Sequence, residues 1–99
     1  MKDNFSNIID SKTPVIIDFF ADWCGPCKML TPILKDVKDE LGEHIKIVKI
    51  DVDKNQSLAA KYQVRGVPTM MLFKEGKQLW RQSGVLQKND IIKVINMHR

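Results

Sequence analysis

One run of six residues, Val15 to Phe20, constrains the fold of this chain more than any other segment. It is β-branched or aromatic throughout except for a single aspartate, Asp18. A strand whose apolar residues do not alternate with polar ones is buried on both faces, which is typical of parallel pairing in an α/β sheet. The run therefore predicts a sheet with helices on both faces.

The periodicity of the other segments predicts the elements around this strand. The i, i+3, i+4 spacing of Phe5, Ile8 and Ile9 predicts a short helix over about 4–11, which ends at Thr13-Pro14. Further helices are expected over about 24–41, 56–62 and around 91–95, and further strands over 45–52, 69–73 and 78–83. Pro32 lies inside the long helix and is expected to kink it. The order predicts an α/β fold with one mixed sheet.

The length and charge of the chain limit its number of domains and the classes of partner it can bind. Its 99 residues, 43% of them hydrophobic, are expected to form one domain over residues 1–99. Without a signal peptide or a transmembrane stretch, we expect a soluble protein of the reducing cytoplasm, with no membrane partner. The 16 Lys and Arg are scattered among 12 Asp and Glu. This mixture indicates a solvated surface and no nucleic-acid partner.

The only two cysteines, Cys24 and Cys27, stand where the apolar run has ended and a helix can begin. The unpaired N–H groups and positive end of a helix favour a thiolate, which is the reactive form of cysteine. Cys27 follows almost one helical turn later, close enough to attack whatever becomes bonded to Cys24. A disulfide across so short a loop adds little stability, so a structural cross-link explains the pair poorly. The spacing indicates a thiol–disulfide oxidoreductase.

Cys-x-x-Cys pairs also occur in zinc sites, and this alternative needs two further ligands. Only His44 and His98 are available as histidine ligands, and they have no paired spacing. No metal site is therefore expected.

Asp18 is the candidate acid or base, because a carboxylate in the middle of an apolar strand should have a raised pKa and could exchange a proton with Cys27.

Four segments of the chain resemble the thioredoxin family, and together they span nearly all of it. They are Val15–Lys28, which contains Trp23-Cys24-Gly25-Pro26-Cys27, then Lys49–Asp53, Arg65–Thr69 and Gly84. The resemblance implies a thioredoxin fold and a protein disulfide reductase. Members commonly begin with an edge strand that has no counterpart here, so a sheet of about four strands is expected, with the adjacent edge exposed or capped by the N-terminal residues. Phe20 stands where many members have tryptophan.

The resemblance also implies roles for individual residues. Cys24 would be the nucleophile, Cys27 the resolving thiol, Asp18 the buried proton acceptor, and Lys49 its neighbour. Pro68 would follow a cis bond and face the cysteines. An apolar rim that binds extended client segments would surround Cys24; its members would be Trp23, Gly25, Pro26, Val52, Val67, Pro68, Gly84 and Val85. For the valines, and for Lys49, simple core packing or solvation is an equally good interpretation of the sequence alone.

Cofactors and partners follow from the same resemblance. The protein would be a monomer without a bound cofactor, whose redox group is the Cys24–Cys27 disulfide. Electrons would come from NADPH through a flavin-dependent thioredoxin reductase and pass to disulfide-containing client proteins. Two alternatives share the fold. An oxidant or isomerase is disfavoured because Gly25-Pro26 resembles the reducing members, whereas a binding module with incidental thiols stays open as an additional role.

Overall fold

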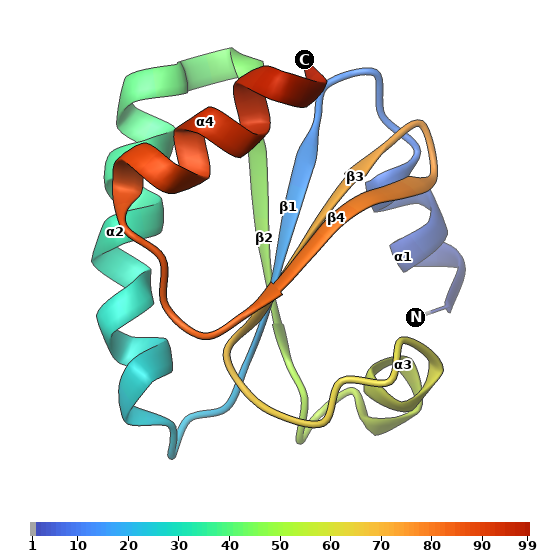
Figure 1. Ribbon diagram of the computed structural model, residues 1–99. Coiled ribbons are helices and arrows are strands. Elements are labelled where there is room, and N and C mark those ends of the chain that lie inside the picture. The colour runs from blue at the N-terminus through green and yellow to red at the C-terminus, as the bar shows by residue number, and fades with distance from the viewer. Residues whose placement is uncertain (1) are drawn as a thin grey trace.

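The computed structural model describes residues 2–99, which form four α-helices, one short 3₁₀ helix and four strands (Figure 1). In chain order these elements are α1 (Lys2–Ile9), β1 (Val15–Phe20), α2 (Gly25–Leu41), η1 (Gly42–His44), β2 (Lys46–Asp51), α3 (Gln56–Lys61), β3 (Thr69–Lys74), β4 (Lys77–Ser83) and α4 (Lys88–His98). The element types agree with those predicted, and β1 has the predicted bounds. The other predicted segments differ at their ends by a few residues.

The four strands form one mixed sheet in the order β2-β1-β3-β4. β1 is parallel to β2 and antiparallel to β3, and β3 and β4 form an antiparallel hairpin. The parallel register pairs Asp18 with Lys49, so their side chains lie on the same face of the sheet. β2 forms one edge, and no strand within residues 2–99 pairs with its outer side. The predicted mixed sheet of about four strands is therefore confirmed.

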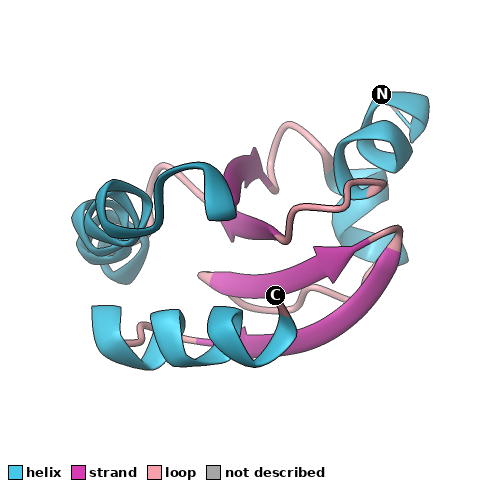
Figure 2. Cartoon of the chain, turned by 90° about the horizontal axis from the view of Figure 1, so that it is seen from above, coloured by secondary structure: helices cyan, strands magenta, loops and turns pink. Residues whose placement is uncertain are grey.

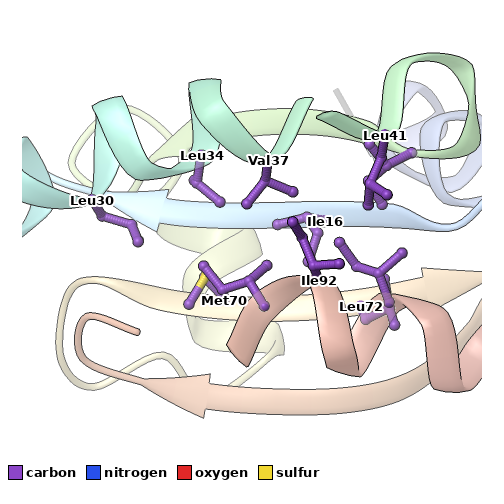
Figure 3. Packing of buried hydrophobic residues seen from close by; sticks show 11 residues of the cluster. Ile16, Leu30, Leu34, Val37, Leu41, Met70, Leu72 and Ile92 are labelled. Atoms are coloured by element: carbon purple, nitrogen blue, oxygen red, sulfur yellow. The ribbon is translucent and has the colours of Figure 1, made fainter. Parts of the chain in front are cut away.

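Helices cover both faces of the sheet, α2 and α4 on one and α1 and α3 on the other (Figures 1 and 2). Residues of β1 alternate between the two layers: Ile16 belongs to the core under α2 and α4, whereas Ile17 packs on the side of α1 and α3. Figure 3 shows the first core, in which side chains of α2 meet β1, β3 and α4. Because β1 is central and buried on both faces, it needs no polar alternation.

The N-terminal helix is held by the hairpin turn rather than along the edge of β2. The backbone N–H of Gly76 donates to the carbonyl of Ile9 at 3.0 Å, and that of Glu75 donates to the carbonyl of Ser11 at 2.8 Å. These bonds satisfy carbonyls at and just after the helix end, which have no partner within the helix. The helix ends at Ile9, two residues before the predicted end near residue 11.

α2 begins at Gly25 and continues through Pro32 to Leu41, where Gly42 ends it with φ +55°. The kink predicted at Pro32 stays a prediction. No helix in the described part of the chain is both long and apolar enough to span a membrane.

Candidate functional site

The two cysteines lie at the start of α2, directly after the carboxyl end of β1. Cys24 is the N-cap residue, with extended backbone angles, and the N–H of Cys27 donates to its Sγ at 3.1 Å. Both side chains are buried, and they form a disulfide with 5.3 Å between their Cα atoms. An N–H directed at the sulfur and the positive end of a 17-residue helix both stabilise a thiolate at Cys24.

The loop before β3 approaches the cysteines from the other side. The carbonyl oxygen of Val67 lies 3.6 Å from Cys24 Sγ, and the Val67–Pro68 peptide bond is cis, as predicted. Val67 and Val52 pack against the small cluster that contains both cysteines. Two segments more than 40 residues apart in the chain thus meet at the disulfide.

Asp18 lies in the middle of β1 and has no exposed surface. Neither carboxylate oxygen has a hydrogen-bond partner among the described residues. Burial raises the pKa of Asp18 from 3.8 to about 6, and the positive charge of Lys49 opposes this rise. The side chain can therefore gain or lose a proton close to neutral pH.

Lys49 is beside Asp18 in the register, and its ammonium is directed toward α2. Its Nζ donates to Thr31 Oγ1 at 2.8 Å and lies 4.7 Å from the centre of the Phe20 ring. The hydroxyl of Thr31 in turn donates to the carbonyl of Cys27 at 3.3 Å. Cys27, Thr31 and Lys49 line a surface hollow of about 120 Å³. Sequence reasoning missed Thr31, although its position four residues after Cys27 on one helix face was a signal.

Trp23 is exposed at the site, with 72% of its surface accessible. Its indole Nε1 donates to Asp53 Oδ2 at 2.9 Å. Trp23, Val52 and Val67 line a second hollow of about 110 Å³ together with residues 64–66. Asp53 was part of a quoted motif but had no predicted role, and only this contact reveals one.

The remaining rim residues lie at different places around the site. Gly25 and Pro26 are exposed at the start of α2. Gly84 lies beside Pro68, because its N–H donates to the carbonyl of Pro68 at 2.9 Å. Gly84 has φ +90°, a conformation that favours glycine. Val85 packs instead against the core under α2 and α4. Among the side chains that the structure describes, residues 4–99, no three His, Cys, Asp or Glu come together as ligands for a metal ion.

The family model described as Thioredoxin matches residues 1–97. The thioredoxin of Chlamydia trachomatis is 46% identical over 98 residues, which cover 99% of this chain and 94% of that protein. The thioredoxin of Rickettsia felis is 44% identical over 89 residues, covering 90% of this chain and 85% of the relative. The oxidized mitochondrial thioredoxin 3 of Saccharomyces cerevisiae superposes with a TM-score of 0.87 at 32% identity, covering 97% of this chain and 89% of that one.

The chain belongs to the thioredoxin family. Thioredoxins are thiol–disulfide oxidoreductases, and the adjacent cysteines of this chain form the disulfide on which that chemistry depends. The protein is therefore a protein disulfide reductase that acts by dithiol–disulfide exchange through Cys24 and Cys27.

Proposed function

We propose that Cys24 is the nucleophile of this thioredoxin and that Cys27 is the resolving thiol. The observation that carries this assignment is the N-cap contact, in which the N–H of Cys27 donates to Cys24 Sγ. Of the two sulfurs, Cys24 Sγ has both this donor and the Val67 carbonyl as neighbours. Its thiolate is stabilised at a helix start, whereas Cys27 lies one turn further along the helix.

The exchange proceeds in two steps. The Cys24 thiolate attacks one sulfur of a client disulfide, a mixed disulfide forms, and the other client sulfur leaves as a thiolate. Cys27 then loses its proton and attacks Cys24 Sγ, which releases the first client sulfur as the second thiolate. The client gains two electrons, and the Cys24–Cys27 disulfide forms. Protons from solvent and from Cys27 neutralise the two client thiolates.

Asp18 is the proposed acceptor of the proton that Cys27 loses. Its pKa of about 6 is close enough to neutral pH for proton transfer in either direction. Neither oxygen of its carboxylate is hydrogen-bonded to another described residue, so both are free to accept a proton. Lys49 would stabilise the thiolate that Cys27 forms, because a nearby cation favours the anionic form of an acid.

The apolar rim is the proposed client-binding surface. Trp23, Val67 and the exposed Gly25 and Pro26 at the start of α2 provide it. Gly84 and Pro68, which is buried, belong to it only as the family resemblance implies. A largely apolar patch of this kind can hold many extended segments without reading their sequence.

The wider setting is proposed from the family. Residues 1–99 would form one thioredoxin domain that works as a cytoplasmic monomer in cell redox homeostasis and electron transport. NADPH would supply electrons through thioredoxin reductase, and disulfide-containing proteins would receive them. The chain itself would need no bound cofactor, metal or nucleic acid.

Trapping experiments test the roles of the two cysteines. A Cys27→Ser variant should accumulate a mixed disulfide with a disulfide-bearing client protein, because attack by Cys24 is retained and release is blocked. The matched Cys24→Ser variant should trap none.

The reduction potential of the unaltered cysteine pair, measured in thiol redox buffers, should be about −270 mV, which is typical of thioredoxins. Trapping through Cys27 would contradict the assignment, and a potential near about −120 mV would indicate an oxidant.

A further inference from the structure

Thr31 connects two parts of the site that are distant in sequence. Its hydroxyl accepts a hydrogen bond from the Lys49 ammonium at 2.8 Å and donates one to the carbonyl of Cys27 at 3.3 Å. One side chain on the exposed surface of α2 thus joins β2 to the backbone of the second cysteine. Both the donor and the acceptor capacity of the hydroxyl are used.

Nothing else in the described chain restrains the Lys49 ammonium by a hydrogen bond or an ion pair. Lys49 takes part in neither of the two salt bridges between described residues, and its other contact is the face of the Phe20 ring. A lysine side chain has four rotatable bonds and a strongly hydrated head group, so without a partner it would extend into solvent. The hydroxyl of Thr31 is the group that keeps this charge at the hollow beside Cys27.

We propose that Thr31 is a positioning residue of the exchange site, which holds the Lys49 ammonium beside Cys27 and over the same sheet face as Asp18. The proposal deepens the function given above, because Asp18 and Cys27 are the groups between which the proton passes there. Substitution of Thr31 would let the ammonium move into solvent. Asp22 and Lys28, the other charged residues of the hollow, would stay in place.

The test measures the pKa of Asp18 by carboxyl-carbon NMR in the oxidised protein, in which the cysteines do not titrate. Because a nearby cation lowers this pKa, Thr31→Val should raise it by a few tenths of a pH unit to about one unit. Thr31→Ser keeps the hydroxyl and should leave the value unchanged. Lys49→Met should raise it at least as much as Thr31→Val, and adding Thr31→Val to Lys49→Met should have no further effect.

Three results would overturn the proposal: an unchanged pKa in Thr31→Val, an equal rise in Thr31→Ser, or a rise that persists when Lys49 is already methionine. Thr31→Ala serves as a second hydroxyl-free variant if valine perturbs the helix. The pH at which client release is half-maximal should be higher in Thr31→Val than in wild type, by the same amount as the pKa of Asp18. The NMR measurement needs no client, so it decides the role of Thr31 even if Asp18 proves not to be the proton acceptor.

Discussion

At the scale of single residues, Asp18, the proposed proton acceptor, lowers the stability of the folded protein at neutral pH because it is buried. Its carboxyl group is fully buried and has no hydrogen-bond partner among the described side chains, and burial raises its pKa to about 6. Ionising it in the folded protein is therefore harder than in the unfolded chain, where the ordinary value of 3.8 applies. The folded state binds more protons than the unfolded state between these two values, so its stability falls as pH rises through this window.

Asp18→Asn should remove this penalty. The rise from 3.8 to about 6 corresponds to about 3 kcal/mol, so the oxidised variant should gain up to this much stability at pH 8 and little below pH 4. Urea unfolding at both pH values measures the gain. An equal gain at both values would mean that the ionisation of Asp18 is not its cause.

The same variant should be slower as a reductase. Without the proposed proton acceptor, release of client from the mixed disulfide should slow by about 10²-fold at pH 7, the lower end of what general acid–base catalysis contributes. Stopped-flow measurement of the attack and release steps separates the two. Attack by Cys24 should be unaffected, and a slower attack with normal release would contradict the role given to Asp18.

At the scale of elements, the β3–β4 turn has the backbone that a tight hairpin needs. Glu75 and Gly76 are its two loop residues, with φ +52° and +82°. Two-residue hairpin loops with positive φ at both positions favour Asn-Gly, whereas glutamate is strained in this conformation. The same turn also binds the end of α1 through its two N–H groups, so its shape matters beyond the hairpin.

Glu75→Asn should therefore stabilise the protein by about 0.5–1 kcal/mol, because asparagine tolerates left-handed backbone angles better than glutamate. Thermal and urea unfolding of the oxidised form provide the measurement. Glu75→Gln is the matched control, since it removes the same charge without the conformational preference. Equal stabilisation by both variants would assign the effect to charge.

At the scale of the whole molecule, the site lies where the carboxyl end of β1 meets the start of α2, while the layer of α1 and α3 covers the opposite sheet face. Phe5 connects that layer to the sheet: its ring lies 5.4 Å from that of Tyr62 and 5.8 Å from that of Phe73, between centroids. The edge strand β2 carries the exposed Lys46, and a charge on an edge strand discourages pairing with other chains.

Phe5→Ala should cost about 3–5 kcal/mol of unfolding free energy, because it leaves a cavity among buried aromatic rings. Below the unfolding transition, the rate of client reduction should be unchanged, since Phe5 packs on the sheet face opposite α2. Ser6→Ala, on the exposed side of the same helix, is the control and should change stability by less than about 0.5 kcal/mol. A large loss of reductase rate in folded Phe5→Ala would show that the two layers are coupled.

The sequence by itself determined the features that depend on neighbouring residues. The unbroken apolar run of β1, the buried Asp18 within it and the cysteines at the following helix start were predictable, because strand burial and helix capping are local rules. The four-stranded sheet was predicted because the chain has no counterpart of the N-terminal edge strand common in the family.

Only the tertiary structure decided the contacts between distant segments. Thr31 and Lys49 are 18 residues apart, Trp23 and Asp53 are 30 apart, and the carbonyl of Ile9 at the end of α1 accepts from the N–H of Gly76. None of these pairs carries a local signal, because polar side chains on exposed positions are compatible with solvent as well as with a partner. Whether such a side chain contacts solvent or a partner depends on how the elements pack. In this protein, packing brings Lys49 to Thr31, beside Cys27.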